Sequence, residues 1–153
     1  MRVTVLSALA AALAVACGGE KKAADQTAAQ PAAAAPAAAT TGTVDTIRLT
    51  GNGSTQAAFS PAAITIKAGD VVRFINASGG PHNVAFYADS IPGGAATVLN
   101  AAMPNRMDNL SSPFLTTPNQ TYDVSFAGAP KGTYKGFCTP HVALGMKMTI
   151  TVQ

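Results

Sequence analysis

The most informative stretch of this 153-residue chain is Cys138-Thr139-Pro140-His141-Val142-Ala143-Leu144-Gly145-Met146. It places a thiol, an imidazole and a thioether close together in the sequence. A second histidine, His82, lies far upstream in Gly79-Gly80-Pro81-His82-Asn83. The chain has no other histidine, and its only other cysteine is Cys17, near the N-terminus. A site that uses both thiol and imidazole therefore has little choice of other side chains.

One thiolate, two imidazoles and one thioether match a trigonal copper site with a weak axial methionine. Cu(I) prefers the sulfur ligands and Cu(II) accepts imidazole, so a mixed set can hold either oxidation state with little movement. The four side chains predict a closed site that leaves no open position for a substrate. This argues against catalysis.

Other chemistries explain the same residues less well. Structural zinc sites use Cys and His, but a thioether is a poor zinc ligand. Binuclear copper centres would need a second loop cysteine, and copper oxidases would need more histidines. A nucleophilic Cys138–His141 pair is the enzyme alternative, but it lacks an orienting partner. Met148 is an alternative to Met146, which we favour because it follows Gly145 at the loop end. Two further methionines, Met103 and Met107, are expected to be packing residues or surface thioethers.

The rest of the C-terminal part predicts an all-β domain. Short runs of β-branched and aromatic residues alternate with polar ones and are separated by Gly, Pro and Asn turns. The expected strands cover residues 44–50, 62–67, 71–76, 84–87, 122–126, 132–138 and 147–152. Residues 88–120 break the pattern and predict a long connection with one short helix. The pattern indicates a β-sandwich or barrel.

Residues 44–153 suffice for one compact core. They carry seven Lys and Arg against five Asp, without clustering. This excludes the basic patch that nucleic-acid binding requires. A disulfide within the domain is also excluded, because Cys138 is its only cysteine.

From about Lys67 to Gln153 the sequence resembles plastocyanin-like blue-copper proteins of the cupredoxin family. The resemblance rests on residues 76–84, residues 132–135 and the Cys-x-Pro-His and His-to-Met spacing of residues 138–146. It implies a Greek-key β-sandwich of about seven to eight strands that binds one type 1 copper ion. The implied metal ligands are His82, Cys138, His141 and Met146.

The resemblance also implies roles around the metal. The backbone N–H of Asn83 would donate to the sulfur of Cys138, and Thr139 would be the partner of Asn83 in tying the two ligand loops together. Pro140 has no N–H to offer that sulfur, which predicts a lower reduction potential than in relatives with a second donor.

The implied function is a one-electron carrier between membrane or periplasmic redox partners of cytochrome, oxidase or reaction-centre type. Such partners would dock near a solvent-facing His141, on a patch of Gly79, Gly80, Pro81, Pro140, Val142, Leu144 and Gly145. Plant relatives have acidic patches and a Tyr before the Cys, whereas this chain has only Asp89 near that region and carries Phe137. We therefore expect apolar docking with weak salt dependence by a monomer that is not an enzyme. The alternative is a copper-binding or copper-delivery protein without redox turnover.

The N-terminus predicts export. Residues 1–16 form a leader with Arg2, an apolar run and the small Ala16; a core helix is the alternative for this run. Residues 13–19 resemble a bacterial lipobox, which implies a lipid anchor at Cys17; a conventional signal peptide is the alternative. Residues 17–43 are an Ala- and Pro-rich linker with too few large apolar side chains to fold. We expect a periplasmic or cell-envelope protein.

Overall fold

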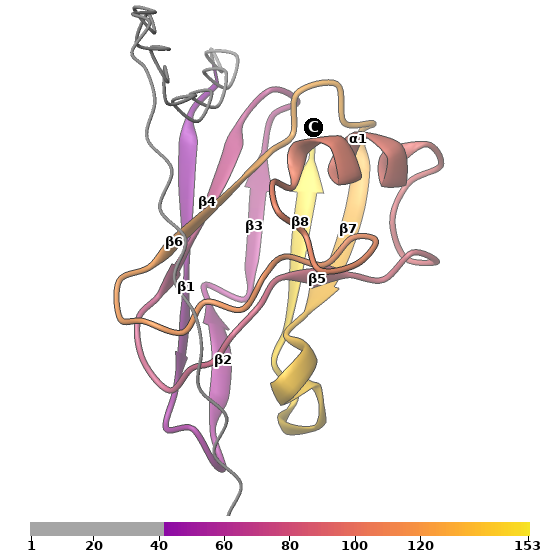
Figure 1. The fold of residues 1–153 in the computed structure, drawn as a ribbon. Helices are drawn as coiled ribbons and strands as arrows, with labels where there is room; N and C mark the ends of the chain where they lie inside the picture. The colour runs from indigo at the N-terminus through magenta and orange to yellow at the C-terminus, as the bar shows by residue number, and fades with distance from the viewer. Residues whose placement is uncertain (1–41) are drawn as a thin grey trace, which may run out of the picture. The chain divides into compact units, whose positions relative to one another are not determined.

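The computed structural model describes residues 42–153 (Figure 1). The predicted leader, Cys17 and the linker up to residue 41 lie outside the described residues. At its first residues the described chain already bonds to the domain. The N–H of Thr43 donates to the Asp70 carboxylate at 2.8 Å, and the Thr43 carbonyl accepts from Val71 at 2.9 Å.

Within residues 42–153, eight strands form two four-stranded sheets. The first sheet has the order β2-β1-β4-β6, with strands β2 (Ala57–Ser60), β1 (Val44–Gly51), β4 (Val71–Asn76) and β6 (Thr121–Ser125). The second has the order β3-β8-β7-β5, with strands β3 (Ala63–Ile66), β8 (Lys147–Val152), β7 (Gly132–Phe137) and β5 (Ala85–Phe86). Each sheet is mixed, because β1 pairs with β4 and β3 with β8 in parallel.

The alternation along each strand puts one face of each sheet into a common core. In β8 the buried residues are Met148, Ile150 and Val152. Aromatic rings join the two sheets, since Phe126 at the end of β6 meets Tyr134 of β7 edge-on, with 5.4 Å between ring centroids. The prediction of an all-β sandwich with seven to eight strands is therefore confirmed.

The long connection between β5 and β6 contains the one short helix expected there, α1 (Ala95–Ala102). It begins after Gly94, whose φ of 80° is the left-handed conformation that glycine adopts readily. Ala95 and Leu99 are its buried residues and pack into the core. The helix crosses the end of the sandwich where β8 finishes, opposite the 3₁₀ helix η1 (Thr139–Leu144), as Figure 1 shows.

Two elements were not predicted. Strand β2 follows a Gly, Asn and Ser turn, and Phe59 is its one fully buried residue beside the small, half-buried Ala57, so its sequence pattern is weak. The second is η1, which lies within the motif that dominated the sequence interpretation. The remaining strands coincide with the expected ones to within about two residues at each end.

Candidate metal centre

The backbone of His82 is held by one distant segment of the chain. Its N–H donates to the Leu115 carbonyl at 3.1 Å, and its carbonyl accepts from the Leu115 N–H at 2.7 Å. The returning half of the long connection thus fixes a residue that lies just before β5. The His82 side chain is fully buried.

A hydrogen bond at Nε2 determines which ring nitrogen of His82 carries the proton. Nε2 lies 2.8 Å from the carbonyl oxygen of Ser78, which can only accept, so Nε2 carries the proton. In the neutral ring Nδ1 is then a free lone pair, available to a metal. Burial lowers the pKa of His82, the hydrogen bond to the Ser78 carbonyl raises it, and electrostatic repulsion by the neighbouring His141 lowers it further. The neutral ring that a metal requires is therefore favoured.

The loop from Cys138 to Met146 is closed by its own backbone. The N–H of Cys138 donates to the Met146 carbonyl at 3.1 Å, and the Met146 N–H donates to the His141 carbonyl at 3.2 Å. Between them η1 begins with Pro140 in its first turn and ends at Gly145, whose φ of 80° favours glycine. The first half of the loop leaves β7 and the last residue leads into β8, so two adjacent strands of one sheet position it.

Three potential ligand atoms converge at this end of the sandwich. The sulfur of Cys138 lies 3.6 Å from Nδ1 of His82 and 3.5 Å from Nδ1 of His141, and the two nitrogens are 3.1 Å apart. Two imidazole nitrogens that each bind a metal at about 2 Å are separated by roughly 2.9 to 3.5 Å. The observed separations therefore fit one metal ion between these three atoms. All three residues are buried, with 7% of His141 exposed.

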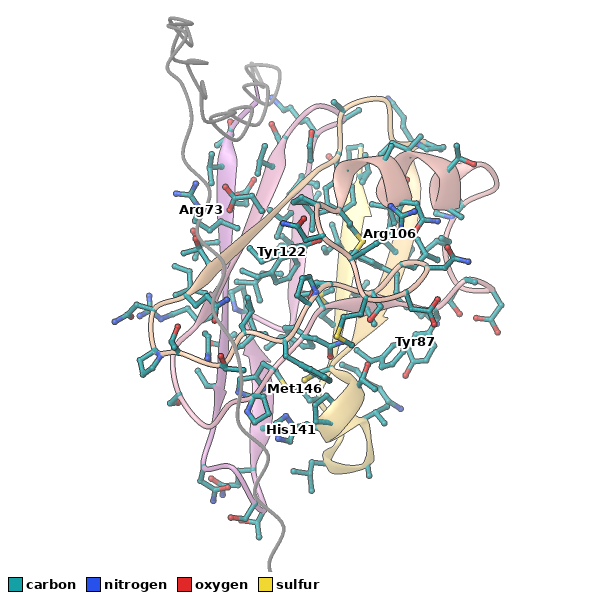
Figure 2. All side chains as sticks on the ribbon, in the orientation of Figure 1. Arg73, Tyr87, Arg106, Tyr122, His141 and Met146 are labelled. Atoms are coloured by element: carbon teal, nitrogen blue, oxygen red, sulfur yellow. The ribbon has the colours of Figure 1, made fainter. Side chains whose placement is uncertain are left out.

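Met146 is fully buried and belongs to the same closed loop (Figure 2). Met148, the alternative, packs elsewhere. Its methyl group lies so close to Gly136 of β7 that a Cβ on that glycine would come within 2.5 Å of it. The structure thus places Met146 with the ligand loop and Met148 against the neighbouring strand.

Asn83 connects the two segments that carry the donors. Its N–H lies 3.4 Å from the Cys138 sulfur, its side-chain oxygen accepts from the Thr139 N–H at 2.7 Å, and its Nδ2 donates to the Thr139 hydroxyl at 3.1 Å. The tie expected between Asn83 and Thr139 is therefore present. Burial raises the pKa of the Cys138 thiol, while backbone N–H groups of Asn83 and His141 lower it. Without a cation nearby the buried sulfur would favour its protonated form.

Sequence reasoning missed the backbone partners of His82. Both Ser78 and Leu115 act through main-chain groups, which every residue possesses, so no residue type marks them. The hydroxyl of Ser112 was also missed, and it accepts from the Val84 N–H at 2.9 Å beside the site.

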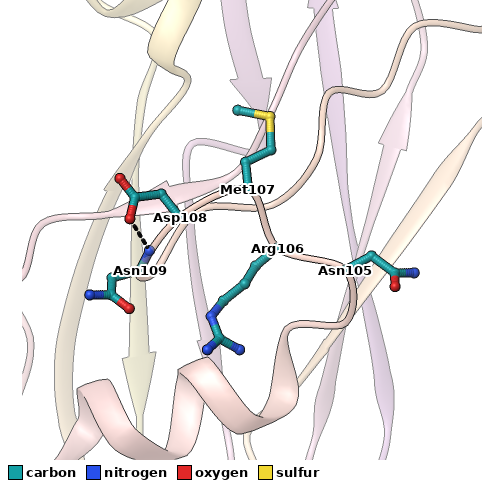
Figure 3. A pocket seen from close by; sticks show the side chains of 5 residues that line it. All are labelled: Asn105, Arg106, Met107, Asp108 and Asn109. Carbon is teal, nitrogen blue, oxygen red and sulfur yellow. Dashed lines mark hydrogen bonds between the residues drawn. The ribbon is translucent and has the colours of Figure 1, made fainter.

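A hollow of about 440 Å³ lies along a single loop, residues 105–109, after α1 (Figure 3). Its polar groups bond locally: Arg106 donates to the Asn100 carbonyl at 2.7 Å, and Asp108 accepts from the Asn109 N–H at 2.7 Å. Met107 is exposed here, whereas Met103 is buried in the core, so the expectation of packing and surface roles is confirmed. This hollow contributes nothing to the donor cluster.

The geometry agrees with comparisons to known proteins. Residues 46–153 match the sequence profile of the copper-binding proteins of the plastocyanin/azurin family. The chain belongs to this family. Its residues fit the copper ion that the family binds, since a buried thiolate and two imidazoles are the donors that suit it.

Plastocyanin from Scenedesmus fuscus is 42% identical to the chain over 108 residues, which cover 71% of this chain and 98% of that protein. A plastocyanin from Synechococcus sp. (strain JA-2-3B'a(2-13)) is 36% identical over 102 residues, covering 67% and 68%. Among solved structures, oxidised plastocyanin from Dryopteris crassirhizoma superposes with a TM-score of 0.53 at 30% identity, covering 69% of this chain and 99% of that one. The plastocyanin-like fold and the copper cofactor expected from the sequence are thus confirmed.

Proposed function

We propose that this plastocyanin-like protein carries single electrons between redox partners, and that it is a carrier rather than an enzyme. The observation that supports this best is the closed, buried cluster of the Cys138 sulfur and the two Nδ1 atoms. Bound copper supplies one-electron chemistry between its Cu(I) and Cu(II) states. A carrier needs a site that changes little between those states, and such a site needs no substrate position.

We assign the donors as follows. Cys138, His82 and His141 would hold the copper ion through one sulfur and two nitrogens, and Met146 would supply a weaker thioether donor. The Ser78 carbonyl orients the His82 ring through Nε2, and Asn83 holds the two loops in register. The burial of all four side chains excludes water from the metal. Because the Ser78 carbonyl fixes the His82 ring and main-chain bonds close the loop from Cys138 to Met146, these parts of the site are in place before the metal binds.

Electrons are proposed to pass at the end of the molecule that carries η1, near His141. Val142 and Leu144 are 37% and 40% exposed there, among the larger exposed apolar side chains of residues 42–153. Pro81, Pro140 and Gly145 are also exposed. Such a small apolar surface suits the weak and short-lived contacts of redox partners. We expect partners of cytochrome, oxidase or reaction-centre type to dock a monomer here, with weak salt dependence.

We further propose three parts for the chain: a leader (1–16), a linker with its lipid anchor at Cys17 (17–43) and the copper domain (44–153). The leader composition and the lipobox-like residues 13–19 support export and anchoring. As a flexible coil the linker would span roughly 28 Å, and it would reach about 80 Å when extended. Within residues 42–153 no helix is long and apolar enough to cross a membrane.

The anchor is testable in a bacterial host that exports the chain. Labelled palmitate should enter the wild-type protein and be absent from Cys17→Ser, which should be released into the soluble periplasmic fraction. Cys138→Ser is the control and should keep the label. Unlabelled wild type in a periplasmic extract would leave the conventional signal peptide as the explanation.

The carrier function is tested by adding Cu(II) to the full chain and recording its visible spectrum before and after ascorbate. An intense visible band that bleaches on reduction and returns on reoxidation is expected. Cys138→Ser should abolish the band, and Met107→Leu, which removes an exposed thioether, should leave it intact. A colourless protein that binds one oxidation state and passes copper to a chelator would instead indicate copper delivery.

A further inference from the structure

Asn76, the last residue of β4, joins the first sheet to the long connection between β5 and β6. Its N–H donates to the Gln120 carbonyl at 2.9 Å, and its carbonyl accepts from the Asn119 N–H at 2.8 Å. Its side-chain Nδ2 donates to the carbonyl oxygens of Leu115 and Thr117, each at 3.1 Å. One residue of the sheet thus holds the returning half of the connection through four hydrogen bonds.

The orientation of the Asn76 amide follows from these partners. A carbonyl oxygen can only accept, so Nδ2, and not Oδ1, faces Leu115 and Thr117. Asn76 is only 2% exposed, and Oδ1 is the buried side-chain atom that lacks a hydrogen-bond partner among residues 42–153. Burying an unpaired acceptor costs free energy, which an apolar side chain of similar size would avoid. What the asparagine contributes here is therefore its pair of N–H donors.

The carbonyl of Leu115 connects Asn76 to His82. This oxygen accepts from the His82 N–H at 3.1 Å and from the Asn76 amide at 3.1 Å. The three groups are closely packed, since a Cβ on Gly80 would lie 3.0 Å from Nδ2 of Asn76 and 3.2 Å from the Leu115 oxygen. His82 meets Leu115 in an isolated pair outside the strands. The position of the His82 backbone therefore depends on how firmly Leu115 is held.

The residues just after β4 also act on the ring of His82. The carbonyl of Ser78 accepts from Nε2 at 2.8 Å, and the N–H of Ser78 donates to the Leu49 carbonyl of β1 at 3.3 Å. The end of β4 and its continuation thus reach His82 in two ways: at the backbone through Leu115, and at the ring through Ser78.

We propose that Asn76 is a positioning residue for the metal. By holding the Leu115 carbonyl, its amide fixes the backbone of His82, and with it the place that Nδ1 occupies when copper binds. Cu(II) favours imidazole more than Cu(I) does, so a less firmly held His82 should weaken the oxidised state more than the reduced state. Only this effect on copper rests on the proposed electron-carrier function.

The first test uses the ¹⁵N-labelled, metal-free full chain and Asn76→Leu, which removes the donors but keeps the size of the side chain. Hydrogen exchange of the His82 amide should become faster by a factor of about two to ten relative to the amides of β8, as expected for the loss of one hydrogen bond. A merely structural role would speed exchange at all core amides together. Asn76→Ala, which cannot crowd Gly80, should show the same selective change.

The second test loads the same proteins with copper. Competition with a chelator should show Cu(II) binding that is about tenfold weaker in Asn76→Leu, with a smaller loss for Cu(I). The reduction potential, measured by mediated voltammetry, should therefore rise.

The matched control is Tyr122→Phe, which removes the hydroxyl that binds the Pro104 carbonyl and so loosens another part of the same long connection. It should change neither the relative exchange of the His82 amide nor the potential. Equal effects of the control and Asn76→Leu, uniformly faster exchange, or an unchanged potential in protein that binds copper would overturn the proposal. Selective exchange at His82 in a chain that gives no coloured copper site would support the positioning of His82 and contradict only the carrier function.

Discussion

At the scale of single residues, the sulfur of Cys138 is the most sensitive atom. The Asn83 N–H lies 3.4 Å from it, the backbone N–H of His141 also acts on it, and Pro140 two residues after Cys138 has no N–H to give. A donor draws charge from a thiolate and so favours the reduced metal, which needs less charge from its ligand. The identity of residue 140 should therefore influence the reduction potential.

We predict that Pro140→Ala raises the potential by tens of millivolts. A tenfold change in a one-electron equilibrium is about 59 mV, and a hydrogen bond to a charged group contributes about 1.5 to 3 kcal/mol, only part of which differs between the two states. Mediated voltammetry of the copper-loaded protein measures the shift. Val142→Ala, in the same helix but without a new N–H, should leave the potential nearly unchanged. A fall in the potential of Pro140→Ala would contradict the argument.

At the scale of elements, β7 connects the sheet to the site, and at Gly136 it has no room for a side chain. Gly136 is paired with Phe86 on one side and Met148 on the other. We predict that Gly136→Ala lowers the free energy of unfolding by about 1 to 3 kcal/mol, because the new methyl overpacks a filled space. Urea unfolding measures this through the midpoint. Gly93→Ala, where a Cβ meets nothing within 4 Å, is the matched control. Equal midpoints for the two variants would show that β7 adjusts freely.

The sequence predicted those strands in which apolar and polar side chains alternate, because one face of such a strand is buried. Examples are Val71 to Asn76 and Lys147 to Val152. Strand β2 was missed because pairing with β1, rather than its own residues, makes it a strand. The ligand types were predictable because Cys138, His82 and His141 are almost the only such groups in the chain. The orientation of these side chains could not be predicted, because it depends on main-chain groups such as the Ser78 carbonyl.

At the scale of the whole molecule, Tyr122 couples stability to alkaline pH. It lies in β6, and its hydroxyl donates to the Pro104 carbonyl at 2.9 Å, which links the sheet to the long connection. Burial raises the pKa of Tyr122 to about 12, against the opposing effect of Arg106. In the unfolded chain the pKa is about 10. The fold therefore favours the protonated ring, and this stabilisation is complete below pH 10 and lost as pH rises towards 12.

We predict that wild type loses up to about 2 to 3 kcal/mol more than Tyr122→Phe between pH 10 and 12, since one pKa unit corresponds to about 1.36 kcal/mol. Urea unfolding of both proteins across this range measures the difference. The variant serves as the control for lysines and for the other tyrosines, which titrate in both proteins. Parallel loss of stability in the two proteins would assign the pH effect to other groups.

Metal binding should stabilise the entire domain, because its donors come from segments that only the fold brings together. His82 precedes β5, whereas Cys138 and His141 lie between β7 and β8, so the unfolded chain cannot present them jointly. A ligand that binds only the folded state at 100 times its Kd adds about 2.7 kcal/mol. For a domain of about 100 residues this corresponds to a rise in Tm of roughly 10 °C or more.

Calorimetry of the copper-loaded and the chelator-treated full chain measures this rise in Tm, and Cys138→Ser should show only a small part of it. If the loaded and metal-free proteins unfolded at the same temperature, the three donors would not be acting as one site.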